Sequence, residues 1–214
     1  AYGPALQARG ERAFGYDVWT KNVPEMVVED RYDGDLNRGI SYHVDHGNGM
    51  DCYAVGPTLG GGTAALFPDS TIVYPYCYKE CEVLDNGPLR FTAKLVYNPL
   101  VVKGDSNVIE TRVISLDKGS QLNKTVVTYD NLGAVTPVAT GIVLHKQNPS
   151  GYSFNVNEGY IAYADSTENA HNNNGVIYLG AVFPANVHAT TQLFSEAEQK
   201  ERGGALGHVC LLYT

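Results

Sequence analysis

The sequence predicts an all-β fold, a large antiparallel β-sandwich that forms one domain over residues 1–214. Fifteen tyrosines, twenty-three glycines and many β-branched residues favour strands joined by turns over helices. Several segments alternate apolar and polar residues, which is the period of a strand with one buried face. A length of 214 residues suits a single core, because β-sandwiches of this size commonly do not divide.

The clearest strand lies at residues 89–97, where apolar side chains alternate with Arg90, Thr92 and Lys94. Residues 85–88 are Asp, Asn, Gly and Pro, which are typical turn formers, and they introduce this strand. One face of the strand should therefore be buried and the other exposed to water.

A hairpin is expected next along the chain. Residues 108–116 and 122–129 have strand character, and Gly119 between them can adopt the positive φ of a tight turn. Turns rich in Asn, Gly and Pro separate the remaining strands. These strands are predicted at residues 141–145, 160–164, 175–183 and 205–213.

One segment has the pattern of a helix. At residues 195–200, Ser195 and Glu198 have the spacing of a capping box. The two glycines at residues 203 and 204 should end this helix after a turn or two.

Composition excludes several classes of partner. Fifteen basic against twenty-three acidic residues give a net charge of −8, which would repel a phosphate backbone, so no nucleic-acid partner is expected. No apolar run approaches the roughly 20 residues that a membrane-spanning helix needs. Four cysteines are too few for a disulfide framework. Cys77 and Cys81 would lie roughly 13 Å apart in a straight strand, so a bridge between them would need a turn or bulge.

Residues 42–53 are the best candidate for chemistry, because they hold two of the six histidines together with two aspartates. His43, Asp45 and His46 could ligate a divalent metal, or could supply an acid/base pair whose tautomer a carboxylate fixes. The spacing H-x-D-H is not a specific signature, however. A polar loop whose side chains cap their own backbone remains the alternative.

Other segments give weaker signals. Residues 56–63 are glycine-rich but lack a phosphate-loop pattern, and we expect a mobile loop beside the site. His145 ends an apolar strand, where it could face a concave binding surface or be structural. His208 lies within a strand, where we expect it to pack. The aromatic residues at 74–78, with Trp19 and Tyr53, could stack on sugar rings or belong to the core.

Several motifs of the sequence resemble those of a known family. Residues 17–21, 42–56, 84–90 and 110–120 together are similar to the bacterial domain-of-unknown-function family 4861, and the match spans most of the chain. The resemblance implies a central fragment of a longer, exported protein, periplasmic or extracellular, encoded beside polysaccharide-degrading enzymes. Residues 110–129 also resemble the strand pair of galactose-mutarotase-like supersandwiches, although a fold alone does not decide function.

What the resemblance implies is an acidic oligosaccharide ligand and elimination at a uronic acid unit, by a lyase or dehydratase. A base would remove the proton at C5 while cations or hydrogen bonds stabilise the enolate. An acidic protein needs a local positive site for such a sugar. The implied acid/base residues are His43, His46 and Tyr53, and the implied substrate-binding residues are Lys21, Arg38, Arg90, Trp19, Tyr76 and His145.

Two rival functions stay open. A mutarotase-like epimerase would need a histidine acid and a carboxylate base across one sugar-sized pocket, and His145 and Glu158 are its candidates. A non-catalytic sugar-binding module would keep the aromatic residues without needing the histidines. The sequence alone does not identify the sugar, the linkage or a metal.

Overall fold

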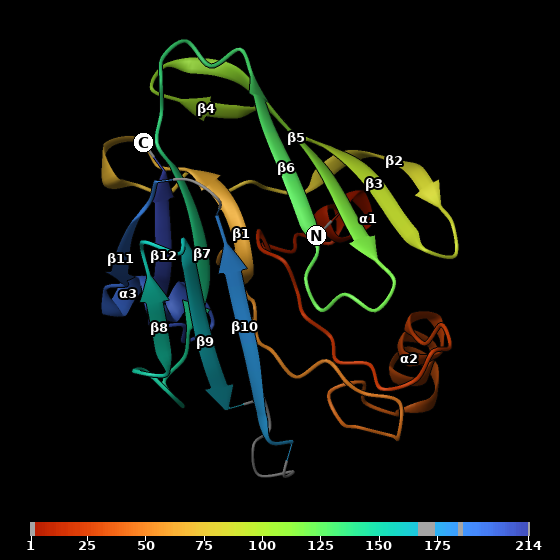
Figure 1. Cartoon of the computed structure of the whole chain (residues 1–214). Helices are drawn as coiled ribbons and strands as arrows, with labels where there is room; N and C mark the ends of the chain where they lie inside the picture. Colours follow the sequence, from red (N-terminus) through yellow and green to blue (C-terminus); the bar gives the residue numbers. More distant parts are fainter. Residues whose placement is uncertain (1–2, 167–173, 184–185, 214) are drawn as a thin grey trace.

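Most of the described chain folds into strands, as the sequence predicts. The structure is a computed structural model that describes residues 3–166, 174–183 and 186–213. All pairs among its named strands are antiparallel, and the strands form three sheets (Figure 1). The prediction of an all-β sandwich is therefore confirmed.

Strands distant in the sequence are neighbours within each sheet. In spatial order, the first sheet contains β1 (Gly61–Leu66), β7 (Val138–Leu144), β12 (Gly207–Tyr213) and β11 (His188–Leu193). The second contains β10 (Val176–Val182), β9 (Tyr160–Ser166) and β8 (Tyr152–Asn155). The third contains β2 (Tyr78–Asn86), β3 (Arg90–Tyr97), β5 (Asp105–Asp117) and β4 (Leu100–Val102), and β6 (Lys124–Asp130) also pairs with β5.

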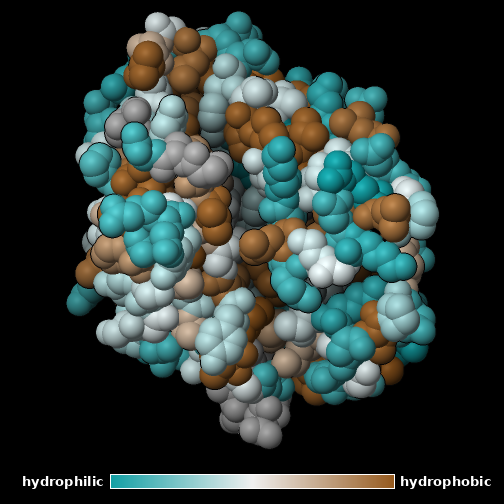
Figure 2. All heavy atoms as spheres, in the orientation of Figure 1, coloured by the Kyte–Doolittle hydropathy of each residue, from teal (hydrophilic) through white to brown (hydrophobic). Residues whose placement is uncertain are grey.

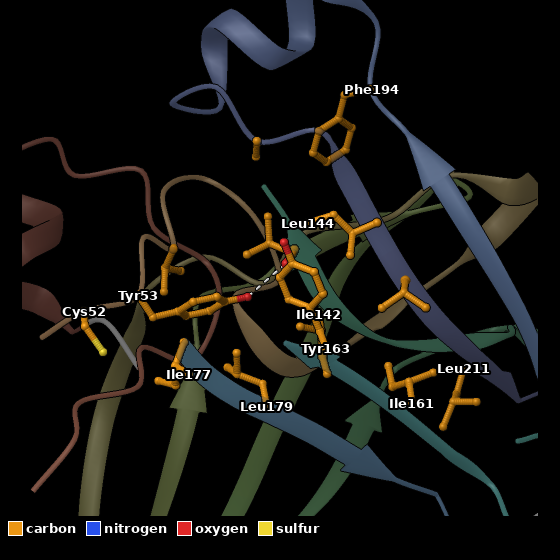
Figure 3. Packing of buried hydrophobic residues seen from close by; sticks show 14 of the residues in the cluster. Cys52, Tyr53, Ile142, Leu144, Ile161, Tyr163, Ile177, Leu179, Phe194 and Leu211 are labelled. Carbon is orange, nitrogen blue, oxygen red and sulfur yellow. Dashed lines mark hydrogen bonds between the residues drawn. The ribbon is translucent and has the colours of Figure 1, made fainter. Parts of the chain in front are cut away.

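The first and second sheets pack against each other and enclose the main hydrophobic core (Figure 1). Strand β7 is mostly apolar and almost wholly buried, since it is covered on both faces. Strand β9 alternates, and its buried side chains are Ile161, Tyr163 and Asp165. Figure 3 shows Ile161 and Tyr163 among the core residues of both sheets. Full burial of each large apolar side chain contributes about 1.5–3 kcal/mol.

The third sheet extends to the side of the sandwich (Figure 1). Its strands β5 and β6 form the predicted hairpin, with Gly119 at a φ of +79°. Two charged residues of β5, Glu110 and Arg112, are fully buried and paired with each other. Arg112 also donates to the backbone carbonyl of Ala64 on β1 (3.2 Å), so this pair joins the third sheet to the first.

The glycine-rich residues 56–63 are not the mobile loop that we expected. Thr58 and Leu59 are fully buried, and β1 begins within the segment at Gly61. The Leu59 N–H donates to Nε2 of His208 (3.0 Å), which confirms that His208 packs inside the sheet. The segment is fixed because its apolar and polar groups both have partners in the first sheet.

Helices are more numerous than the sequence suggests. The predicted capping box is present at α3, where Ser195 and Glu198 cap each other. The prediction missed the other short helices because they lack a simple amphipathic pattern; α2 even buries Arg31 while it exposes Val28. The helical segments are α1 (Pro4–Ala8), α2 (Val28–Asp33), the π-helical turn η1 (Gly34–Arg38), the 3-10 turn η2 (Pro68–Ser70) and α3 (Glu196–Glu201).

Hydrophobic side chains are interspersed with hydrophilic ones over the face in Figure 2, and some gather along the middle, where the sandwich meets the third sheet. In the described part of the chain, no helix has the length and apolar character needed to cross a membrane. Cys77 is buried and Cys81 exposed, and both are unbridged thiols.

Candidate functional site

Asp45 closes the turn of the predicted polar segment, residues 42–53. Its Oδ1 atom accepts hydrogen bonds from the backbone N–H groups of Gly47 (2.8 Å) and Gly49 (3.0 Å). These bonds lower the pKa of the exposed Asp45 carboxyl. Both glycines have positive φ, which permits the bend. At Asp45 the structure therefore matches the alternative in which a polar side chain caps its own backbone.

His46 is also used by the turn. Its Nε2 atom donates to the carbonyl of Ser41 (2.9 Å), and the ring is exposed. In the described part of the chain, no three His, Cys, Asp or Glu side chains converge as they would to hold a metal ion. The structure thus does not assemble His43, Asp45 and His46 into the predicted metal site, because Asp45 and His46 face backbone groups.

His43 is the histidine of this segment that faces a carboxylate. Its Nδ1 atom lies 3.2 Å from the carbonyl oxygen and 3.7 Å from Oδ2 of Asp51. The side chain of Asp51 is 10% exposed and that of His43 is 33% exposed. Both acceptors favour the tautomer with its proton on Nδ1, in which the basic lone pair is on Nε2. A partly exposed imidazole oriented by a carboxylate can act as a general base.

Three aromatic rings gather beside His43, and we call Trp19, Tyr32 and Tyr42 the aromatic cluster. Their ring centroids lie between 5.0 and 5.6 Å apart. Tyr42 also contacts the ring of His43, at a centroid distance of 4.5 Å. The indole Nε1 of Trp19 donates to Oδ2 of Asp17 (3.0 Å), which fixes the orientation of the indole. Tyr32 is 44% exposed, so the cluster presents an aromatic edge to solvent.

Arg31 of α2 supports the cluster from below the surface. It is buried, and its guanidinium carbon lies 5.6 Å from the ring centroid of Trp19. One guanidinium nitrogen donates to the carbonyls of Thr20 (3.2 Å) and Asn48 (2.5 Å). Arg31 therefore ties the segment that carries Trp19 to the turn that precedes Asp51.

Tyr53 belongs to the core and not to an accessible site. The side chain is fully buried, and its hydroxyl donates to the carbonyl of Val143 (3.0 Å). Figure 3 shows the ring inside the apolar cluster, near Ile177 and Leu179. Burial raises the pKa of Tyr53 well above its usual value, with a smaller contribution from the negative charge of Asp165. The structure does not support the expected acid/base role of Tyr53.

The two predicted substrate-binding arginines are already paired with aspartates. Arg38 pairs with Asp30 (2.7 Å) and with Asp33 (2.9 Å) on the outer side of α2. Arg90, the first residue of β3, makes a bidentate contact with Asp117 at the end of β5 (2.6 and 2.9 Å). The structure shows no contact between either arginine and the aromatic cluster. Both guanidinium groups are directed toward aspartates instead.

Lys21 and Tyr76 have different surroundings. Lys21 lies two residues after Trp19, is exposed, and donates to the carbonyl of Pro24 (3.3 Å). Tyr76 donates to the carbonyl of Glu11 (3.0 Å) and packs edge-on against Phe14. Lys21 is therefore close to the aromatic cluster in the sequence. Tyr76 belongs to a separate aromatic group.

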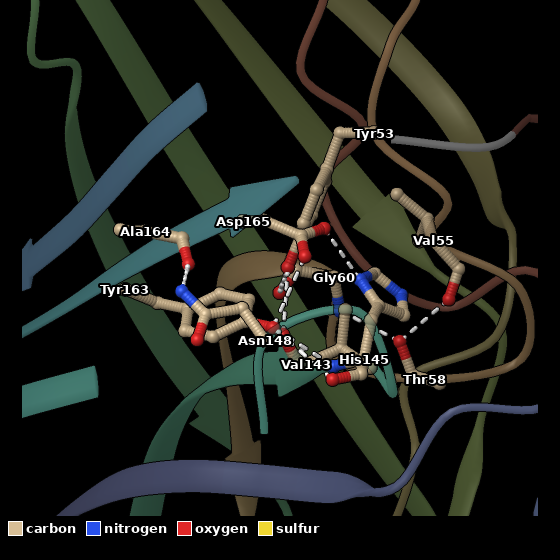
Figure 4. Close-up of polar contacts among 10 residues, drawn as sticks. All are labelled: Tyr53, Val55, Thr58, Gly60, Val143, His145, Asn148, Tyr163, Ala164 and Asp165. Carbon is tan, nitrogen blue, oxygen red and sulfur yellow. Dashed lines mark hydrogen bonds and ion pairs between the residues drawn. The ribbon is translucent and has the colours of Figure 1, made fainter. Parts of the chain in front are cut away.

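His145 forms a second histidine–aspartate pair, shown in Figure 4. Its Nδ1 atom lies 2.7 Å from Oδ2 of Asp165, and the other carboxylate oxygen accepts from the hydroxyl of Tyr163 (3.1 Å). The Tyr163 hydroxyl in turn accepts the backbone N–H of His145 (3.0 Å). The ring of Tyr53 meets His145 edge-on at 5.4 Å. The strand-end histidine is thus buried and partnered.

The epimerase alternative would need Glu158 opposite His145, and the structure does not place them so. Glu158 is exposed at the turn between β8 and β9, where its N–H donates to Asn155. Asp165 lies near the opposite end of β9, roughly 20 Å farther along the strand at about 3.3 Å per residue. The carboxylate beside His145 is therefore Asp165.

Several residues of the site were not predicted. Asp165 could have been found from the alternation of β9, because Ile161 and Tyr163 precede it on the buried face. Tyr32 and Arg31 gave no such signal, since α2 has no clear amphipathic period. Asp51 was within the predicted segment, but its pairing with His43 depends on the turn.

Comparisons with known proteins agree with the family resemblance of the sequence. The family model described as "Domain of unknown function (DUF4861)" matches residues 1–210. The chain is also similar to "Uncharacterized protein P7" of Formosa agariphila, with 28% identity over 173 residues. That match covers 77% of this chain and 42% of the relative, so the chain spans less than half the relative's length. No solved structure matches the chain.

Proposed function

The chain belongs to the family described as domain of unknown function DUF4861, and we propose that it acts on carbohydrate, as a lyase or dehydratase that eliminates at uronic acid units of oligosaccharides. The observation that carries the proposal is the His43–Asp51 pair beside the aromatic cluster. An imidazole base next to aromatic rings is a combination that can both bind a sugar and remove a proton from it.

His43 is the base in this proposal. Asp51 holds the imidazole in the tautomer whose lone pair is on Nε2, and we assign to that atom the removal of the proton from C5 of the uronate. The electron pair of the C5–H bond forms the C4–C5 double bond, and the bond between C4 and its oxygen substituent breaks. Such proton transfer by a positioned side chain contributes typically about 10²–10⁴-fold in rate.

The aromatic cluster supplies the binding surface. The apolar face of a pyranose ring stacks on aromatic side chains, and Tyr32 is the most exposed ring of the three. Asp17 and Arg31 hold Trp19 from two sides, so the surface is formed before a sugar arrives. A preformed surface lowers the entropy cost of binding.

Lys21 is our candidate for the cation that faces the substrate carboxylate. The predicted alternatives, Arg38 and Arg90, are each paired with aspartates. Lys21 contacts a neutral carbonyl, and it follows Trp19 by two residues. An exposed ammonium can reorient toward an anionic ligand at little cost, because it holds no ion pair that the structure describes.

The test uses uronate oligosaccharides and follows the ultraviolet absorbance of the unsaturated product. Wild type should form product, His43→Gln should lose about 10²-fold or more in kcat, and Lys21→Met should mainly raise KM. His188→Gln is the matched control, because His188 is exposed on β11. Trp19 is the single tryptophan, so quenching of its fluorescence reports binding at the cluster separately from catalysis.

Each rival function has its own outcome. Quenching of Trp19 by a sugar without any product would replace the lyase with a sugar-binding module. Interconversion of anomers without unsaturated product would indicate an epimerase. If no uronate oligosaccharide is bound or converted, the proposed function is wrong.

A further inference from the structure

The His145–Asp165 pair has the geometry of an oriented acid/base group. The carboxylate of Asp165 is 1% exposed and is held on both oxygens, by His145 Nδ1 at 2.7 Å and by the Tyr163 hydroxyl at 3.1 Å. A carboxylate at Nδ1 fixes the ring and stabilises the imidazolium form. Figure 4 shows the imidazole between Asp165 on one side and Val55 and Thr58 on the other.

The remaining nitrogen of the ring is the reactive one. His145 Nε2 has no hydrogen-bond partner among the described residues, yet it is not one of the fully buried polar atoms. The side chain is 8% exposed, so Nε2 reaches the molecular surface. The other buried histidine, His208, differs in both respects: it is fully buried, and the structure shows no carboxylate beside it.

A short segment joins this pair to the candidate site. Asp51 faces His43, and Tyr53, two residues later, packs edge-on against His145. Residues two apart in extended backbone are roughly 7 Å apart. Cys52 between them is buried and lies within reach of the charges of both Asp51 and Asp165. Residues 51–53 therefore connect the two histidine–aspartate pairs along the chain, through Asp51 at one end and Tyr53 at the other.

We propose that His145 is the acid of the elimination, with Asp165 as the positioning residue that holds it; this rests on the function proposed above. Elimination needs a donor for the oxygen that leaves C4. The residues first expected to share that role do not serve it, because His46 faces a turn carbonyl and Tyr53 is in the core. His145 is the remaining histidine with a carboxylate partner in the described chain, and its side chain is 8% exposed.

The proposed elimination balances in protons and electrons. His43 takes the proton from C5, and its bonding pair becomes the C4–C5 double bond. The C4–O bond breaks with its electrons on oxygen, and the imidazolium of His145 gives its Nε2 proton to that oxygen. The products are a hydroxyl-bearing leaving group, or water, and an unsaturated uronate. Proton exchange with water returns both histidines to their starting forms.

The first test compares His145→Gln and Asp165→Asn with the wild-type protein on uronate oligosaccharides. We expect both variants to lose about 10²–10⁴-fold in kcat, with KM and Trp19 quenching nearly unchanged. The amide of Asp165→Asn keeps the shape of the carboxylate but no longer stabilises the imidazolium. The control variants are His188→Gln and Asp130→Asn, which are exposed and should keep full activity.

The outcomes separate the two proposals. If wild type is active and a folded His145→Gln variant keeps its kcat, this inference is overturned while the proposed function stands. If wild type neither binds nor converts any uronate oligosaccharide, the proposed function fails and the inference fails with it. Thermal unfolding of each variant shows whether a loss of rate is a loss of fold.

A chemical measurement covers the case in which the variants do not fold. Diethyl pyrocarbonate modifies accessible neutral imidazole nitrogens, and mass spectrometry of peptides can locate the modified histidine. Native wild type should be modified at His145 but not at His208, and a bound uronate oligosaccharide should protect His145. Failure of His145 to react before denaturation, or reaction that the sugar does not slow, would overturn the inference.

Discussion

Trp19 and Asp51 face each other across an isolated antiparallel bridge. At the adjacent positions, Thr20 and Met50 exchange two backbone hydrogen bonds (2.9 and 3.2 Å). The bridge places the indole of the aromatic cluster next to the carboxylate that faces His43. Binding surface and base are thus held by one backbone contact between segments about thirty residues apart in the sequence.

Gly49→Ala should break this contact. Gly49 has a φ of +91°, and an added Cβ would lie 2.2 Å from the carbonyl oxygen of Thr20. The clash is with backbone, so the bridge must separate, and the emission of Trp19 should shift. Gly47→Ala is the control, because its φ is +96° but an added Cβ would have open space around it.

We expect Gly47→Ala to cost about 1–2 kcal/mol of unfolding free energy from backbone strain alone. Gly49→Ala should cost more and should also weaken sugar binding at the cluster. Denaturant unfolding and Trp19 fluorescence measure the two effects. Equal losses in both variants would show that the close approach to Thr20 does not matter.

Asp45 should contribute stability that depends on pH. Hydrogen bonds from Gly47 and Gly49 lower its pKa in the folded state below the unfolded value near 3.9. Its contribution is therefore fully present above the unfolded pKa and is lost as pH falls through the folded pKa. Asp45→Ala should be less stable than wild type at neutral pH, and the difference should shrink in acid.

Asp45→Asn tests the cause of that effect. An asparagine oxygen can accept the same two backbone hydrogen bonds without a charge. We expect it to keep most of the stability at neutral pH and to lose the acid dependence that Asp45 contributes. Thermal unfolding of the three proteins across the acid range measures this. An unchanged pH profile in Asp45→Asn would contradict the assignment.

His208 should make the fold sensitive to acid over a different window. Burial lowers the pKa of His208 to about 3, with a smaller contribution from the charge of Arg202. Between pH 6.5 and about 3 the unfolded chain binds a proton that the folded chain does not. The unfolding free energy should fall by about 1.4 kcal/mol per pH unit below 6.5, and this contribution is constant above 6.5.

His208→Gln isolates this effect, because a glutamine oxygen can still accept the N–H of Leu59. Its unfolding free energy should change less than that of wild type between pH 6.5 and 4. His188→Gln serves as the exposed control and should keep the wild-type slope. Parallel pH profiles for wild type and His208→Gln would show that His208 titrates in the folded protein.

The strands could be predicted because their signals are local. The alternation at residues 89–97 and the turn at Gly119 each involve neighbours in the chain, and both are present in β3 and the β5–β6 hairpin. The capping box of Ser195 is local as well. The helix α2 was missed because it inverts the usual pattern, with Arg31 buried and Val28 exposed.

The site could be located only in part. The density of polar residues at 42–53 predicted the segment that carries both His43 and its partner Asp51, because the two are only eight residues apart. It could not indicate that Asp45 and His46 would turn to backbone groups, because that depends on the path of the loop. The pairing of His145 with Asp165 depends on how β7 meets β9, which no spacing in the sequence specifies.

The buried Glu110–Arg112 pair gives a last prediction. Both side chains are fully buried, and the Arg112 guanidinium lies over the ring of Tyr97 at 4.5 Å. Arg112→Met leaves the Glu110 carboxylate in the core without its cation, and removing one partner of a buried pair typically costs about 3–5 kcal/mol. Glu110→Gln should be costly for the same reason.

The double variant should cost less than the sum of the two single variants, because no unpaired charge then remains. Urea unfolding of the four proteins gives the coupling free energy directly. Arg112 also binds Ala64 of β1, so Arg112→Met should loosen the third sheet against the first, seen as faster amide exchange in β5. Strictly additive costs would mean that the two charges do not stabilise each other, and the attachment of the third sheet would then rest on its apolar contacts.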